Sequence, residues 1–141
     1  METPDLVRAS LVRVDTLETF DVLWNPARYR IERRRRLHAV EVLGAARAHL
    51  EGVGREELFR TELFVDTTDR PAGPGRDARA VVEVLASWMG VAAQSAGLCQ
   101  VVFVWGSFRF AGVLDVVEEE WLRFDPDGTP VRAWVTVVLR R

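Results

Sequence analysis

The sequence has no lysine, one cysteine and two histidines, and each scarcity excludes a class of protein. Cys99 alone cannot form an internal disulfide framework, and its apolar neighbours predict a buried thiol that packs as a small apolar side chain. His38 and His49 are eleven residues apart, and neither has a cysteine or another histidine at metal-ligand spacing. We therefore expect no metal site, no cofactor site and no Cys–His nucleophile.

Long apolar runs are also lacking. No stretch approaches the roughly 18 apolar residues of a membrane span. The segment Met1–Arg8 carries two acidic residues in place of the apolar centre of a signal peptide. We therefore expect a soluble, cytoplasmic protein that does not insert into membranes. All 19 basic residues are arginine, but 21 acidic residues balance them, which excludes a globally basic nucleic-acid binder. We expect no nucleic-acid partner.

The composition is that of one globular domain spanning residues 1–141. Of the 141 residues, 48% are hydrophobic, which is enough for a real core at this chain length. Apolar and polar residues alternate with a period of two in several segments, the pattern of half-buried strands. The expected strands are Val7–Val14, Phe20–Trp24, Leu58–Asp66, Gln100–Trp105, Phe108–Glu118, Trp121–Phe124 and Val131–Leu139.

The C-terminal strands carry apolar residues on both faces. Val135 and Val137 alternate with Trp134 and Val138, for example. One face of an antiparallel sheet is usually wet, so a helix, another sheet or another subunit should cover the second face. Between these strands, Asp125–Pro130 has the residues of a hairpin turn. A calcium loop is disfavoured there because further acidic ligands are missing.

One helix is predicted after the breaker Pro71–Gly75. Its apolar residues recur at helical spacing, Asp77 lies in the first turn and Gly90 suits the end. The stripe comprises Ala78, Val81, Val82, Leu85, Trp88 and Met89, and it should pack on the sheet. The segment Leu37–Leu50, with Val42, Leu43 and Ala46 at helical spacing, fits either a short helix or an extended loop, and Glu51–Gly54 should end any element there.

Two charged runs have competing interpretations. Arg33–Arg36, extended by Arg28 and Arg30, fits a solvated loop or strand edge, or a surface for an acidic protein partner. Glu118–Glu120 is predicted to be a solvated edge or a turn. Because no acid, base and nucleophile can be assembled from the available residues, we do not expect an enzyme.

Six motifs in order resemble one known family. They are Trp24-Asn25-Pro26 with Tyr29, Phe59–Thr67, Arg76–Arg79, Val102–Gly106, Phe110–Val113 and Phe124–Ala133. The series resembles the N-terminal domain of the contractile injection system tube protein family, over about Ala9 to Arg140. Trp24 replaces the family's usual Phe before Asn-Pro. Many members continue into a LysM domain, whereas this sequence stops at Arg141, which indicates a tube-only version.

The resemblance implies a mainly β fold: an antiparallel tube-type β-barrel or sandwich of about seven strands with one flanking helix. It implies a homo-oligomeric, hexameric ring that initiates the inner tube, with the inner-tube protein, the spike hub and other baseplate proteins as partners. The alternatives are an inner-tube subunit, a tube–sheath adaptor or, more distantly, a stand-alone β-barrel whose ligand pocket Trp105 or Trp134 would line. Candidate interface residues are Arg33, Arg34, Arg35, Arg36, Arg132 and Trp134. The motif residues with an expected structural role are Trp24, Asn25, Pro26, Asp66, Trp105, Gly106, Gly112, Asp127, Gly128 and Pro130.

Overall fold

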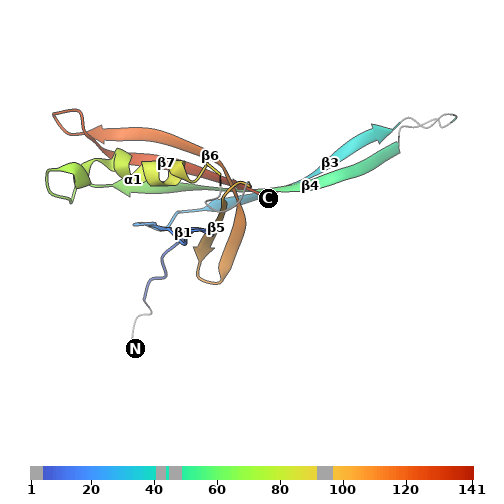
Figure 1. Cartoon of the computed structure of the whole chain (residues 1–141), viewed down its shortest axis with the longest axis horizontal. Coiled ribbons are helices and arrows are strands. Elements are labelled where there is room, and N and C mark those ends of the chain that lie inside the picture. The colour runs from blue at the N-terminus through green and yellow to red at the C-terminus, as the bar shows by residue number, and fades with distance from the viewer. Residues whose placement is uncertain (1–4, 41–43, 45–48, 92–96) are drawn as a thin grey trace.

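The computed structural model of the chain describes residues 5–40, 44, 49–91 and 97–141. Seven strands form one antiparallel sheet in the order β2-β1-β5-β6-β7-β4-β3 (Figure 1). The strands are β1 (Ser10–Arg13), β2 (Thr19–Asp21), β3 (Tyr29–Val40), β4 (His49–Asp66), β5 (Gln100–Trp105), β6 (Phe108–Phe124) and β7 (Pro130–Arg140). A 3₁₀ turn (Pro74–Arg76) leads into the helix α1 (Ala78–Ser87). The predicted mainly β fold class is confirmed. Within the described residues, the outermost strands β2 and β3 do not pair, so one chain is not a closed barrel.

The sheet bends along β6, so that its two halves face each other. The first part of β6 pairs with β5 and the later part with β7. Gly112 lies at the crossover, where a Cβ atom would come within 2.6 Å of the Arg140 carbonyl oxygen, and only glycine permits that approach. Aromatic rings fill the space between the halves, with the Phe59 ring centroid 4.7 Å from that of Phe103 and 5.4 Å from that of Phe110. These contacts form the centre of the core.

Helix α1 covers one end of this core. Its N-cap Asp77 accepts a hydrogen bond from the Arg79 backbone N–H at 3.0 Å, as expected for an acidic residue at that position. The helix contacts β7. The predicted stripe is largely confirmed, because Ala78, Val82, Leu85 and Trp88 are buried and Val81 is partly buried. Met89 is 44% exposed, because the helix ends at Ser87 and the chain turns before that side chain can reach the sheet.

The outer parts of β3 and β4 leave the body as a long two-stranded ribbon (Figure 1). We call residues 33–40 and 49–56 the arm. This overturns the expectation of a helix or loop over Leu37–Leu50, of which Val42, Leu43 and Ala46 lie outside the described residues. The run Glu51–Gly54 does not end an element either. It lies inside β4, where the pairing shifts between Arg36 opposite Gly54 and Leu37 opposite Gly52, so that the extra residue is taken up as a bulge.

The other predicted strands differ from the observed ones mainly at exposed segments. Gln100–Trp105 is confirmed, and the last strand is one residue longer at each end than predicted. The two expected strands on either side of Glu118–Glu120 are one strand, because β7 pairs with β6 through that run. Of the two environments predicted for the run, the solvated edge is confirmed and the turn is wrong. The first two strands are shorter than Val7–Val14 and Phe20–Trp24. β3 was not among the expected strands, because its side chains are almost all exposed and show no apolar alternation, and only a strand edge at Arg33–Arg36 was considered.

Candidate assembly interface

The sheet leaves two long backbone edges without a neighbour among the described residues. β3 is the last strand, and its outer side is open along its length. β5 pairs with β6 only as far as Val113, so the outer side of β6 is open from Leu114 to Phe124. Open edges present unpaired N–H and C=O groups that can pair with another strand. These two edges are where the sheet can be extended.

The two edges have opposite directions. The later part of β6, β7, the second half of β4 and the start of β3 lie side by side, and each neighbouring pair is antiparallel. We call these four strands the four-stranded segment. Because the number of strands is even, β6 and β3 at its two sides run in opposite directions. The segment can therefore add a copy of itself at either side and keep an antiparallel ladder.

The arm is held to the body by two glutamates at its base. Glu57 lies 2.9 Å from the guanidinium groups of both Arg55 and Arg141, and Arg33 approaches it at 3.7 Å. The hydrogen bond from Arg141 is the main cause that lowers the pKa of Glu57 below its ordinary value. Backbone hydrogen bonds of 2.9 and 3.0 Å also join Glu57 and Arg141. The neighbouring Glu56 carboxylate forms ion pairs with Arg36 and Arg140.

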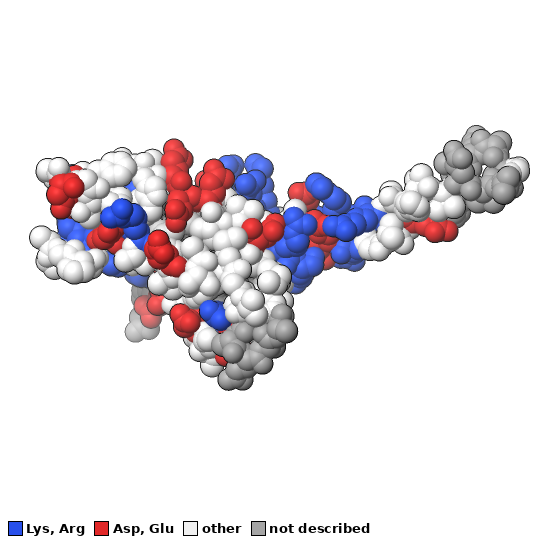
Figure 2. Space-filling model, turned by 45° about the horizontal axis from the view of Figure 1, so that its top comes forward, with Lys and Arg blue, Asp and Glu red and all other residues white. Residues whose placement is uncertain are grey.

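The predicted arginine run lies on β3 along the open edge of the arm. Figure 2 shows arginine side chains gathered where the arm leaves the body. Arg33, Arg34 and Arg36 have acidic partners within the chain, while Arg35 makes no ion pair with a described residue. All four side chains are exposed. The run is therefore a strand edge, one of the environments that the sequence allowed.

An aromatic row lies on the sheet face that is turned away from α1. The rings of Trp24 and Trp134 pack on Phe64, with centroid distances of 5.3 and 5.0 Å. Trp24 and Trp134 stay 51% and 41% exposed, so the row is an apolar surface. Asn25 holds the adjacent loop in place by accepting from the Ala9 N–H and donating to the Val7 carbonyl, both at 2.8 Å. Pro26 is buried beside it.

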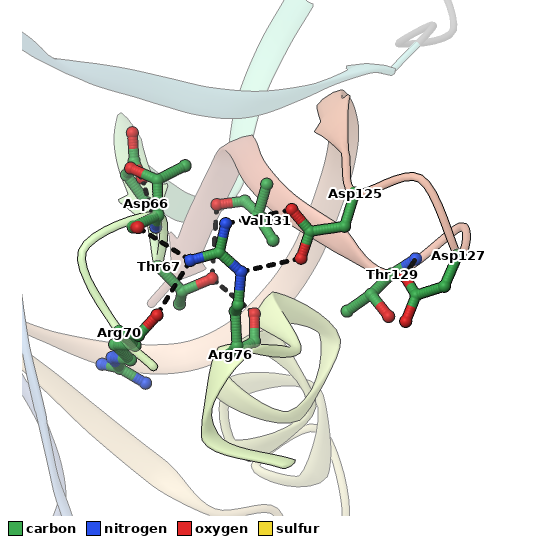
Figure 3. Close-up of polar contacts among 9 residues, drawn as sticks. Asp66, Thr67, Arg70, Arg76, Asp125, Asp127, Thr129 and Val131 are labelled. Atoms are coloured by element: carbon green, nitrogen blue, oxygen red, sulfur yellow. Dashed lines mark hydrogen bonds and ion pairs between the residues drawn. The ribbon is translucent and has the colours of Figure 1, made fainter. Parts of the chain in front are cut away.

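Several motif residues meet in one polar cluster at the end of the body (Figure 3). The Arg76 guanidinium holds Asp125 through two hydrogen bonds of 2.7 and 3.0 Å, and it donates to the carbonyls of Thr68 and Arg70. The bond from Arg76 is the main cause that lowers the pKa of Asp125. Asp66 lies nearby and binds Arg132 at 2.8 Å. The cluster therefore joins the end of β4 to the start of α1 and to the β6–β7 turn.

Hydrogen bonds outweigh burial in setting the pKa of Asp66. Partial burial raises its pKa, but bonds from Thr68 and Arg132 outweigh burial and leave the pKa below the ordinary value. Arg132, a predicted interface residue, is thus engaged within its own chain. In the adjacent turn, Gly128 has a φ of 89°, which glycine adopts freely, and Asp127 accepts from the Thr129 N–H at 2.9 Å. The backbone angle of Gly128 and the hydrogen bond of Asp127 both fit the predicted hairpin turn.

The remaining motif residues lie in turns, at a strand end or in packing contacts within the chain. The Trp105 indole donates to the Val7 carbonyl at 3.2 Å, and its ring packs near Tyr29. Gly106 lies in the turn between β5 and β6, and Pro130 begins β7. Cys99 is buried, as predicted. Within the described part of the chain, no group of three or more metal-ligating side chains gathers, and no helix has the length and apolar character to cross a membrane.

The sequence did not indicate which residues organise this interface, although Arg76 belongs to one of the six motifs. Glu56, Glu57 and Arg140 anchor the arm, and Arg76 anchors the polar cluster. A signal for the arm was present, because Arg33 and Arg34 lie opposite Glu57 and Glu56 in the ladder and opposite charges favour cross-strand pairing. Reading that signal requires knowing that the two segments are paired. The acidic run Glu118–Glu120 likewise acquires its meaning from its place on the open β6 edge.

The comparison with known proteins agrees with the architecture. Residues 9–141 match the family described as contractile injection system tube protein. No curated protein matches the chain. The match covers nearly the whole sequence, including both open edges and the arm. The chain therefore belongs to the contractile injection system tube protein family.

Proposed function

We propose that this protein forms a hexameric ring in the baseplate that initiates the inner tube of a contractile injection system. The observation that carries the proposal is the four-stranded segment with its two open, oppositely directed edges. Family membership supports a structural role in the tube assembly. The position between the spike hub and the first tube layer, in a particle assembled in the cytoplasm, is part of the proposal.

The ring closes by pairing sheet edges. Copies related by rotation about one axis bring the β3 edge of one copy to the β6 edge of the next, and every junction is antiparallel because the segment has an even number of strands. Repetition of this contact gives a continuous barrel without open edges. The sheet face with the aromatic row and the face under α1 then become the two surfaces of the barrel. Apolar residues such as Trp134 would take part in contacts with neighbouring proteins.

The arm supplies the contact with the next layer. Its strands project beyond the body and pair only with each other, and an isolated pair of strands is marginally stable in water. A partner surface would stabilise this ribbon. The arginines Arg33–Arg36 would set the register of the next ring against acidic neighbours, since charge complementarity contributes orientation and specificity. A ring preformed in this way lowers the entropy cost of ordering the first tube layer.

Native mass spectrometry tests the proposal. The protein is measured alone and after mixing with the inner-tube subunit of the same particle, and copies per assembled particle are counted. We expect a ring that is present as one layer per particle. We also expect that adding this ring to the tube subunit shortens the lag before tubes grow. Many copies along the tube would instead identify an inner-tube subunit, and a layer at the sheath end would identify an adaptor. A protein that stays monomeric in both measurements would contradict ring formation.

A further inference from the structure

Three arginines gather at the base of β3, and none of them forms an ion pair with a described residue. Arg28, Arg30 and Arg60 line one hollow together with Thr61 and Glu62. Arg30 and Arg60 lie directly opposite each other in the β3–β4 ladder, where like charges are unfavourable. All three arginines are exposed, and none makes an ion pair with a described residue. We call these three residues the arginine recess.

The recess has the chemistry of a carboxylate site. Guanidinium groups bind carboxylates through paired, charge-assisted hydrogen bonds, and a carboxylate between them would relieve the repulsion across the ladder. The hollow beside it is lined by Arg30, Glu32 and Arg60 and by the apolar side chains of Ile31, Leu58 and Val138, which add apolar surface to the charged site. A side chain with a short apolar stem and a terminal carboxylate fits both parts. Glutamate is such a side chain.

Two glutamates of the same chain meet these requirements on the opposite edge of the four-stranded segment. Glu118 and Glu120 lie on the open side of β6, and both are exposed and without an ion pair among the described residues. Glu118 is opposite Thr136, which is itself opposite Glu62 on β4. Residues opposite each other share a sheet face, so both glutamates lie on the same face as Arg60 and Arg30. Glu119 lies on the other face.

We infer that the arginine recess of one copy receives Glu118 and Glu120 of the neighbouring copy, and that these contacts set the register of the β3–β6 junction. This inference rests on the proposed ring. Antiparallel pairing that places Glu118 opposite Arg30 also places Glu120 opposite Arg28, and it leaves Glu119 opposite Tyr29 on the far face. A slip of one residue would exchange the faces. A shift by two residues along β3 would bring Glu118 against Glu32 and is therefore disfavoured.

A register further along β3 is disfavoured because its arginines already have acidic partners within the chain. Glu118 could also lie opposite Arg36 with Glu120 opposite Arg34. Those arginines already bind Glu56 at 3.1 Å and Glu32 at 2.6 Å. The arginine recess gains partners that it lacks, whereas Arg34 and Arg36 would have to exchange theirs. Charge complementarity between the two open edges thus favours a second copy as the occupant and selects one register.

Charge reversal and its repair test the inference on the full chain. Glu118→Arg with Glu120→Arg, and separately Arg28→Glu with Arg30→Glu, should each raise the concentration needed for ring formation at least about tenfold. Combining the two sets should restore assembly to within a few fold of the natural protein. Glu119→Arg is the matched control, with the same charge change on the same strand but the other face, and it should leave assembly within about threefold. Light scattering gives the mass, and circular dichroism verifies folding.

The outcomes separate this inference from the proposed function. If the natural protein forms rings and the reversed variants form them equally well, the inference is wrong and the ring stands. Repair by Arg34→Glu with Arg36→Glu, in place of the recess pair, would also overturn the register. If the natural protein stays monomeric alone and with tube subunits, the ring itself is wrong. Neutral Glu118→Gln with Glu120→Gln provides a milder second variant, which should weaken assembly and reduce its salt dependence.

Discussion

The strands β3 and β4 run through both the body and the arm, where their side chains meet opposite conditions. In the second half of β4, Phe59 and Leu63 are fully buried between the halves of the sheet. In the arm, Leu37 is 55% exposed and Val53 is 68% exposed. The body is held by burial of apolar surface, which a single chain can supply. The arm is held by its ladder and a few ion pairs at its base, with little burial of apolar surface among its described residues.

The largest effect is expected from the centre of the body. Phe59→Ala removes the ring that joins the two halves of the sheet and should lower the free energy of unfolding by about 3–5 kcal/mol. Leu37→Ala, a truncation of an exposed apolar residue in the arm, should change it by less than about 0.5 kcal/mol. Urea denaturation of both variants measures the difference. Similar losses would show that the arm is part of the cooperative core.

Removing the arm should separate folding from assembly. Replacing residues 35–55 with Asn-Gly joins Arg34 to Glu56, which lie opposite each other, through a turn that suits a two-residue hairpin. The melting temperature of the body should stay within a few degrees, since almost all the described side chains of the removed part are exposed. Acceleration of tube growth should be lost. A shortened protein that still nucleates tubes as the natural protein does would contradict the role given to the arm.

Charge reversal in the arm should have a smaller effect on assembly than its removal. Changing Arg33–Arg36 to glutamate should leave the body folded and the ring intact, while stacking of the next layer weakens and becomes less sensitive to salt. Replacement of the same four residues by lysine is the control, because the charge is kept. Electron microscopy of assembled particles measures stacking. Normal stacking of the glutamate variant would remove the electrostatic role.

The smallest effect concerns the polar cluster of the body. The pKa of Asp125 lies below its ordinary value of 3.8, so the folded state binds fewer protons than the unfolded state as the pH falls past that value. The stabilisation by the pair with Arg76 is therefore complete at neutral pH and is lost as the pH falls through the folded pKa. Asp125→Asn should lower the melting temperature at neutral pH and make less difference at an acidic pH below the folded pKa of Asp125. An equal difference at both pH values would contradict this linkage.

The contrast between the two regions explains what the sequence could predict. Helix α1 and the strands near Phe103 and Val135 bury one face, so their apolar residues recur with the period of the element. The arm buries neither face. Its charges form a pattern only across the ladder, where arginines of β3 lie opposite glutamates of β4. The continuity of β6 through Glu118–Glu120 was missed for the same reason. Periodicity records burial, whereas the arm and the open edges are formed by pairing.

The motif residues illustrate a second limit. Asp66 and Asp127 belong to conspicuous motifs, and the sequence indicated a turn around Asp127. It could not indicate that Arg76 would reach Asp125, 49 residues away, because it is the pairing of β4 with β7 that brings these segments together. The same holds for the arginine recess, whose members come from the loop before β3, from β3 and from β4. Contacts that depend on the fold of the sheet require the structure.

Disulfide cross-linking between copies tests most directly the claim that the β3 and β6 edges meet. A Glu118→Cys variant is combined in turn with cysteine at Arg30, Arg34 or Arg36, and opposite residues of an antiparallel pair lie within disulfide distance. After oxidation we expect a ladder of linked chains that ends at the closed ring and is strongest for the Arg30 position. Chains that remain single at all three positions, under conditions in which the natural protein forms its ring, would contradict it.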